Sequence, residues 1–245
     1  MALTDKLTAI ADRIRSITGK SEKLNLDEMS QGIMDVFAAG MKNEKDIFWA
    51  KYQNYGNRTN YSYAFAGEGW TPDVFAPCYD IVPTDATSMF ESSQVRKNIS
   101  QVGVKIDFSK ATHLNYVFRD SYFTELGVLD FSNADYLTGV FQLCTGLKTV
   151  EKLILSSTKL QGLSNAFNYC SSLENITIEG YIRYNGVSFA SSSKLTHDSL
   201  MSIITALYDY SGTGETYKII LGSTNLGKLT DEEKEQIARK GWTVS

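Results

Sequence analysis

Hydrophobic and polar positions in the middle of the chain repeat with a unit of 22 to 28 residues. In the three central units apolar and polar residues alternate over a short stretch, and a leucine then stands four residues before a phenylalanine. The alternation predicts a β-strand with one buried face, and the four-residue spacing predicts a short helical turn. Because one unit cannot bury its apolar face alone, we expect the units to stack with their strands in a parallel sheet. The recurring phenylalanines are Phe90, Phe118, Phe141, Phe167 and Phe189.

The alternation also assigns a face of the sheet to each strand residue. Asp107 and Asp130 take equivalent outward positions on adjacent strands, about 4.8 Å apart at normal strand spacing. Two such carboxylates can bind a cation or a sugar, or they can remain solvated beside Lys105 and Lys152. The residues predicted to face the core are Ile106, Phe108, Leu129, Phe131, Leu153, Leu155, Ile176 and Ile178.

Residues 1–45 lack the repeat and show the periodicity of amphipathic helices instead. Two amphipathic helices are predicted there, and the first carries an apolar seam over two heptads. Helices this short are marginal alone, so they either pair with each other in a hairpin or dock and assemble with other chains. We predict a homo-oligomer, and seams of Ile and Leu permit more than two strands. The seam consists of Leu3, Leu7, Ile10, Ile14 and Ile17.

The segments on either side of the repeats are predicted to close the ends of the stack. Residues 46–79 are rich in aromatic residues separated by Asn, Gly, Thr and Ser, which is typical of a cap over an apolar end or of a ligand-binding surface. Residues 196–245 contain a helix that begins after Thr196, a strand at 217–221, and a capping box from Thr230 to Glu233 that begins a second helix. We therefore expect an α/β cap at the C-terminal end.

Charge and composition exclude several functions. With 24 Lys+Arg, 28 Asp+Glu and a net charge of -4, the chain has no electrostatic footprint for nucleic acid. No apolar run is long enough to cross a membrane, and residues 1–20 lack the apolar core of a secretory signal. Cys144 and Cys170 occupy the same repeat position, so we expect them to be small core residues. The sequence holds no catalytic, cofactor or metal motif, so we predict a non-enzymatic protein without cofactor or metal.

Two stretches of the pattern Phe-x-x-Cys-x-x-Leu, beginning at Phe141 and Phe167 and each followed by an aliphatic strand, resemble the BspA-type leucine-rich repeat. The resemblance covers residues 80–195. It implies an α/β repeat fold, a leucine-rich-repeat solenoid with a parallel sheet. The N-terminal helical segment (1–45) and the aromatic cap (46–79) would precede this solenoid, and the C-terminal α/β cap (196–245) would follow it.

The flanking residues 7–29, 48–70 and 195–234 are similar to segments of minor structural and tail-fibre proteins from phages and prophages of Firmicutes. This resemblance implies a component of a virion tail or tail-like particle, whose N-terminal helices bind other tail or baseplate proteins. By analogy with tail fibres, the expected oligomer is a homotrimer. The expected function is recognition of a carbohydrate or protein on a bacterial surface. A purely structural tail or baseplate protein and a bacterial surface adhesin are the alternatives. The candidate binding residues are Lys105, Asp107, Asp130, Lys152, Tyr181, Tyr184, Tyr208 and Tyr210.

Overall fold

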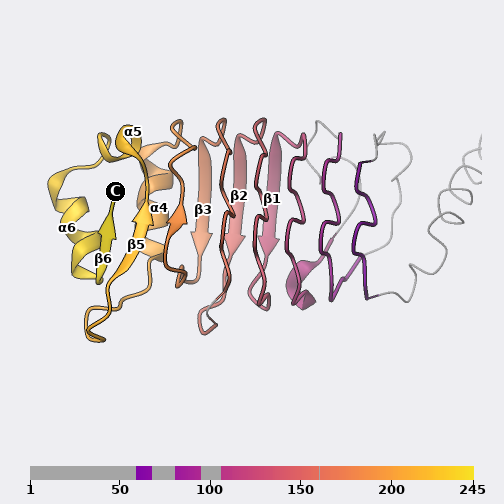
Figure 1. Ribbon diagram of the computed structural model, residues 1–245, viewed down its shortest axis with the longest axis horizontal. Helices are drawn as coiled ribbons and strands as arrows, with labels where there is room; N and C mark the ends of the chain where they lie inside the picture. The colour runs from indigo at the N-terminus through magenta and orange to yellow at the C-terminus, as the bar shows by residue number, and fades with distance from the viewer. Residues whose placement is uncertain (1–58, 68–80, 95–105, 160) are drawn as a thin grey trace, which may run out of the picture. The chain divides into compact units, whose positions relative to one another are not determined.

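The computed structural model describes residues 59–67, 81–94, 106–159 and 161–245 (Figure 1). The chain divides into two units, residues 1–54 and 55–245, and every described residue belongs to the second. The predicted helices of residues 1–45, with their apolar seam, lie outside the described residues. The same holds for most of the aromatic segment 46–79 and for Lys105.

The strands of the described part of the chain form two parallel three-stranded sheets, with the orders β1-β2-β3 and β4-β5-β6. The α-helices come after the first sheet in the chain, where α4 connects β4 to β5, and α5 and α6 connect β5 to β6 (Figure 1). No helix of the described residues is long and apolar enough to cross a membrane. The elements are η3 (Phe108–Lys110), β1 (Glu125–Asp130), β2 (Thr149–Ile154), β3 (Asn175–Glu179), β4 (Val187–Ser188), α4 (His197–Ala206), β5 (Tyr217–Ile220), α5 (Ser223–Leu226), α6 (Asp231–Arg239) and β6 (Trp242–Val244).

The first sheet has the two faces that the alternation predicts. Leu129 pairs with Leu153 in the parallel register, and both side chains are buried. Val128, one position earlier, pairs with Lys152 and is 53% exposed. The predicted core residues of β1, β2 and β3 are all buried, whereas Ile106 of the preceding unit is only half-buried. The alternation is interrupted in β1 and β2, because the buried residues Leu126 and Val150 lie three positions before Leu129 and Leu153.

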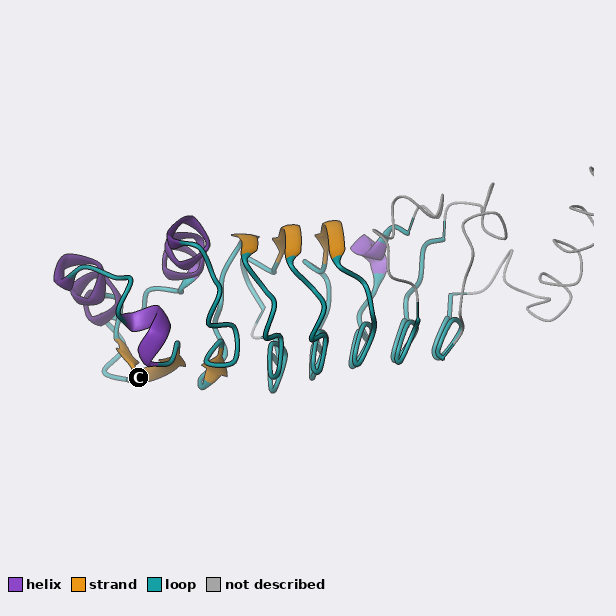
Figure 2. Cartoon of the chain, turned by 90° about the horizontal axis from the view of Figure 1, so that it is seen from above, coloured by secondary structure: helices purple, strands orange, loops and turns teal. Residues whose placement is uncertain are grey.

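The opposite side of each unit is built from successive β-turns, so the predicted helical turn is wrong (Figure 2). In the unit of Phe118, the amide of Arg119 donates to the carbonyl of Tyr116 within the turn (3.0 Å). The amides of Tyr116 and Phe118 instead donate to Thr138 and Val140 of the next unit, at 2.8 and 3.0 Å. An α-helix directs its interior amides to carbonyls four residues back in the same segment, so it could not bond the units to each other in this way.

Left-handed backbone conformations make this turn geometry possible. They recur at the same two places of each turn segment, four residues apart, with φ between 53° and 68°. Most of these positions are not glycine, and each left-handed non-glycine residue costs about 1 kcal/mol. The ladder of hydrogen bonds to the neighbouring unit offsets that strain. The residues are Tyr63, Gly67, Ser88, Ser92, Tyr116, Asp120, Gly139, Leu143, Asn165 and Tyr169.

A column of phenylalanine rings runs through the core of the stack. Phe118 contacts the rings before and after it in the column with centroid distances of 5.6 and 5.8 Å, and both pairs are nearly parallel. The five phenylalanines that the repeat identifies are all buried. Phe65, which the sequence assigned to the aromatic cap, adds a ring 5.2 Å from Phe90 at the start of the column.

A second buried column consists of small residues that lie three positions after each phenylalanine. The thiol of Cys144 donates to the carbonyl of Phe118 (2.8 Å), and the thiol of Cys170 donates to the carbonyl of Phe141 (3.0 Å). Both cysteines are free and buried, which confirms their predicted place in the core. Serines take the equivalent positions in the other units, since a hydroxyl fits the same space. The column is Ser93, Ser121, Cys144, Cys170 and Ser192.

Both thiols are expected to be unreactive because they are buried. Burial raises the pKa of Cys144 from 9.0 to about 11, and it raises the pKa of Cys170 well above 9.0. Since the thiolate is the reactive form, we expect neither cysteine to react with a thiol-specific disulfide reagent at about pH 8 while the protein is folded. A Cys78→Ser background restricts the measurement to these two thiols. Modification of the folded protein as fast as that of the unfolded chain would contradict this assignment.

The raised pKa of Cys144 also predicts a pH dependence of stability. The folded state holds the thiol proton more tightly than the unfolded chain, so this stabilisation is complete below about pH 9 and is lost as the pH rises through about 11. The free energy of unfolding should therefore fall more steeply over this range in the parent protein than in a Cys144→Ser variant. Equal slopes in chemical denaturation would contradict the assignment.

Helix α4 covers the edge of the first sheet at β3. The amides of Ile176 and Ile178 in β3 donate to the hydroxyls of Ser199 and Ser202 in α4, at 2.9 and 2.8 Å. Side chains of the helix thus replace the hydrogen bonds that a further strand would make, which ends the sheet at β3.

The C-terminal segment contains the elements that its sequence predicts. Thr196 caps α4 through the amide of Ser199, and Thr230 and Glu233 form the capping box of α6. The strand predicted at 217–221 is β5. At the end of α4 the ammonium group of Lys240 donates to three backbone carbonyls, at distances of 2.7 to 3.0 Å, and therefore ties α6 to α4.

Candidate functional site

A groove lies at the carboxyl ends of β1, β2 and β3. Its volume is about 700 Å³, within the range of about 300–1,000 Å³ that is usual for ligand sites. The residues that line it come from four segments, Ser132–Asn133, Ile154–Lys159, Ile178–Tyr181 and Thr205–Ala206. In parallel sheets the loops after the strands gather at one edge, which is where such folds usually bind ligands.

An insertion in one repeat builds the main wall of this groove. Leu137 follows Phe131 by six positions, and in the preceding unit Leu114 follows Phe108 by six positions. After β2 the distance from Leu155 to Leu163 is eight positions. The loop after β2 is therefore two residues longer than its neighbours, and insertions in repeats often form the binding face.

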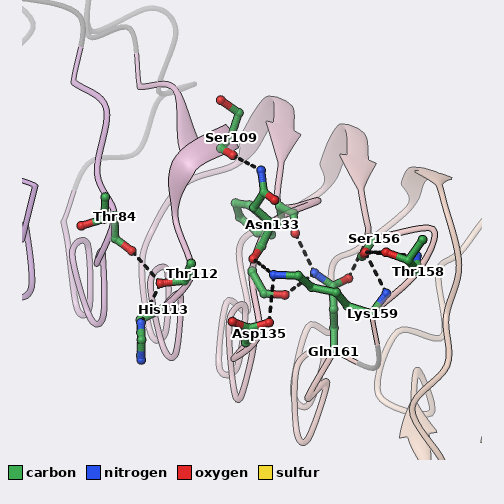
Figure 3. A network of polar contacts seen from close by, with 12 residues as sticks. Thr84, Ser109, Thr112, His113, Asn133, Asp135, Ser156, Thr158, Lys159 and Gln161 are labelled. Carbon is green, nitrogen blue, oxygen red and sulfur yellow. Dashed lines mark hydrogen bonds and ion pairs between the residues drawn. The ribbon is translucent and has the colours of Figure 1, made fainter.

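Gln161 links the loops after β1 and β2, which form two walls of the groove. Its side chain is buried, and its amide nitrogen donates to the carbonyls of Phe131 and Ala134, both at 2.7 Å. Its amide oxygen accepts from the amide of Ser156 at 2.9 Å (Figure 3). One side chain thus ties the loop after β1 to the loop after β2.

The loop after β2 is further ordered by its own side chains. The hydroxyl of Ser156 accepts from the amides of Thr158 and Lys159, at 3.2 and 3.0 Å. The ammonium group of Lys159 contacts the carbonyl of Asn133 at 2.8 Å and the carboxylate of Asp135 at 3.0 Å (Figure 3). Because both loops are held by these contacts, a ligand would not have to order them on binding.

A row of aromatic rings adjoins the groove at Tyr181. This ring lines the groove, is 41% exposed, and meets the ring of Tyr208 edge-on at 5.5 Å. Behind Tyr208 the row continues through Tyr210, Tyr217 and Trp242, with centroid distances of 4.8, 3.8 and 5.4 Å. The buried end of the row fixes the position of its exposed end.

Arg183 connects the aromatic row to the wall of the groove. Its guanidinium group lies over the ring of Tyr208 at 3.5 Å, where the cation attracts the face of the ring. A nitrogen of the same group donates to the carbonyl of Ser157 at 2.7 Å. The arginine therefore holds the groove loop and the tyrosine row in one arrangement.

The four tyrosines predicted as surface-binding residues differ in exposure and in their position relative to the groove. Tyr181 lines the groove and Tyr208 supports it, whereas Tyr184 is not among the lining residues. The prediction that Tyr210 is a surface residue is wrong, because this side chain is only 9% exposed. It stacks on Tyr217, and its hydroxyl donates to the carbonyl of Arg183 at 3.2 Å.

The carboxylates of Asp107 and Asp130 accept hydrogen bonds from backbone amides of the same chain. Asp107 accepts from the amide of Ser109 at 2.9 Å, and Asp130 accepts from the amide of Ser132 at 3.0 Å. Hydrogen bonds from the side chain and backbone of Ser109 lower the pKa of Asp107. Both aspartates cap the turn that follows them. Lys152 pairs with Glu179 of the next strand at 3.2 Å rather than with Asp130.

The described residues contain no cluster of three His, Cys, Asp or Glu side chains that could hold a metal. Comparisons with protein family models, with curated proteins and with solved structures gave no match to this chain. Similarity therefore assigns no family, and the function has to follow from the groove and the residues around it. Several residues of the site were missed in the sequence, although the two-residue insertion after β2 was visible there. They are Asn133, Ser156, Ser157, Thr158, Lys159, Gln161 and Arg183.

Proposed function

We propose that this protein is a non-enzymatic binding module of the leucine-rich-repeat solenoid type, which recognises a molecule on a bacterial surface. The observation that carries the proposal is the groove at the carboxyl ends of β1, β2 and β3, with walls held in place by Gln161, Lys159 and Arg183. A site that is already ordered loses little conformational entropy on binding. The stacked turns and parallel strands are the features that support the solenoid class.

The proposed location is the tail of a phage or a tail-like particle, and it rests on the sequence resemblance of the flanking segments. Residues 1–45 would attach the module to other tail or baseplate proteins and assemble several copies, as a trimer. Several copies on one particle would bind a cell surface with an avidity that exceeds the affinity of one groove.

Binding of the purified full chain to cells tests the proposal. The labelled protein would be applied to a panel of Firmicutes strains and to cell walls isolated from them. We expect saturable binding to some strains. A Thr205→Trp variant, which fills the groove, should reduce this binding by about tenfold or more.

The matched control is Thr177→Trp, at an exposed position of β3 that does not line the groove. This variant should bind as the parent protein does, and thermal unfolding would show that both variants are folded. Absence of binding to every strain by the assembled protein would overturn receptor recognition and favour a purely structural tail component. Equal loss in both variants would show that the groove is not the site.

A further inference from the structure

We infer that the ligand of this groove is a neutral saccharide. The inference rests on the proposed function and adds the chemical class of the ligand. It follows from three properties of the described groove, namely its balanced charge, the hydroxyl and amide groups on its rim, and the exposed ring of Tyr181.

The charges that line the groove are neutralised within the protein. Lys159 and Glu179 are the charged residues among its lining segments. Lys159 pairs with Asp135 at 3.0 Å, and Glu179 pairs with Lys152 at 3.2 Å. A polymer of phosphate groups would gain little from Lys159, because this lining cation already has a carboxylate partner. Arg183, beside the groove, donates instead to the carbonyl of Ser157 and lies over the ring of Tyr208.

The rim offers short polar groups instead. Asn133, Ser157, Thr158 and Thr205 line the groove and are exposed to solvent, and they come from three different segments. The amide nitrogen of Asn133 donates to the carbonyl of Ser109 at 2.6 Å, so this side chain presents chiefly its oxygen to a ligand. Hydroxyl and amide groups can both donate and accept, which matches the hydroxyl groups of a sugar. A set drawn from three segments would contact more than one side of such a ligand.

The ring of Tyr181 supplies the apolar contact that a saccharide needs. A pyranose ring has a face of C–H groups, and a tyrosine ring gives rigid apolar area beside a polar handle. Tyr181 is 41% exposed, and its ring centroid lies 5.5 Å from the ring of Tyr208 and 5.5 Å from the guanidinium carbon of Arg183. The ring is therefore available to a ligand while its position is fixed.

An extended peptide fits the groove less well, because the backbone at this edge is already paired. The amide of Leu155 donates to the carbonyl of Glu179 at 2.8 Å, and the amide of Tyr181 donates to the carbonyl of Ser156 at 3.4 Å. A peptide that adds a strand to a sheet needs an unpaired edge. Side-chain hydroxyls and the ring are what the groove presents.

An array of neutral and anionic oligosaccharides, probed with the full chain, tests the inference. We expect binding to neutral members, with an affinity that changes less than about twofold between 0.05 and 0.5 M salt, since no net charge is neutralised. Tyr181→Ala should weaken binding by about tenfold, and Tyr181→Phe should retain it because the ring remains. Tyr169→Ala, which removes an exposed ring outside the groove, is the matched control and should have no effect.

Three results would overturn the inference. They are binding to anionic members alone with a strong salt dependence, binding to no member, and equal binding by the parent and the Tyr181→Ala variant. Cell binding separates this failure from that of the proposed function. If cells are bound but no neutral saccharide is, the receptor function stands and the ligand class is wrong. If neutral saccharides are bound but no cells are, the ligand class stands and the receptor function is wrong.

Discussion

Replacement of Phe118 by alanine is expected to lower the free energy of unfolding by about 3–5 kcal/mol. The ring is fully buried and contacts two neighbours of the phenylalanine column face to face. It also meets Phe108 and Phe123 edge-on, at 6.1 and 5.8 Å. Its removal leaves a cavity that the stacked units on either side cannot fill without breaking their hydrogen bonds. Chemical denaturation would measure the loss, and the melting temperature should fall by about 10 °C.

Two comparison variants isolate the effect of the cavity. Phe118→Leu keeps most of the volume and should cost about 1 kcal/mol. Tyr169→Ala removes an exposed ring of similar size and should change stability by less than about 0.5 kcal/mol. A Phe118→Ala variant as stable as Tyr169→Ala would show that the column does not carry the stability of the stack.

The substitution Gly180→Ala is expected to cost about 3–5 kcal/mol as well, through the backbone rather than the core. Gly180 has a φ of 86°, and a Cβ atom there would lie 2.0 Å from the carbonyl oxygen of Leu155. Neither backbone can move without separating the ends of β2 and β3, which the hydrogen bond from Leu155 to Glu179 joins at 2.8 Å. Because Gly180 also lines the groove, ligand binding should be lost together with stability.

Gly214→Ala is the matched control for this effect. Gly214 has a φ of 75°, but no atom lies within 4 Å of the position of its Cβ. It should therefore show the cost of a left-handed alanine alone, about 1 kcal/mol, and leave binding unchanged. If Gly180→Ala were no more destabilising than Gly214→Ala in chemical denaturation, the close approach of the backbones would be contradicted.

The sequence predicted the buried residues at the ends of β1 and β2 and throughout β3, because a side-chain period of two needs no distant information. It missed Leu126 and Val150, which are buried because the alternation is interrupted in β1 and β2. It also placed the phenylalanine column, Cys144 and Cys170, and the caps at Thr196 and Thr230, since these depend on repetition or on local hydrogen bonds. It was wrong about the turn side of the units. There a spacing of four residues fits a helical turn and a pair of β-turns equally, and bonds to the next unit favour the β-turns.

Most residues of the candidate site could not be identified from the sequence. Tyr181 was among the candidates, but no local pattern distinguishes it from Tyr210, which the contact with Tyr217 buries. Gln161 and Arg183 act on backbone carbonyls of other segments, and such partners are far away in the chain. The extra length of the loop after β2 can be seen in the sequence, but the position of this loop relative to β3 cannot.

The amino-acid sequence by itself determined the repeat, its buried columns and the atypical segment that follows it, because periodicity and local capping are properties of neighbouring residues. The tertiary structure alone decided which polar residues meet in the groove at the carboxyl ends of β1, β2 and β3. It also decided which of the tyrosines remain accessible. The physical reason is that stacking brings residues about one repeat apart into contact, and their distances depend on loop lengths and turn geometry that only the assembled stack sets.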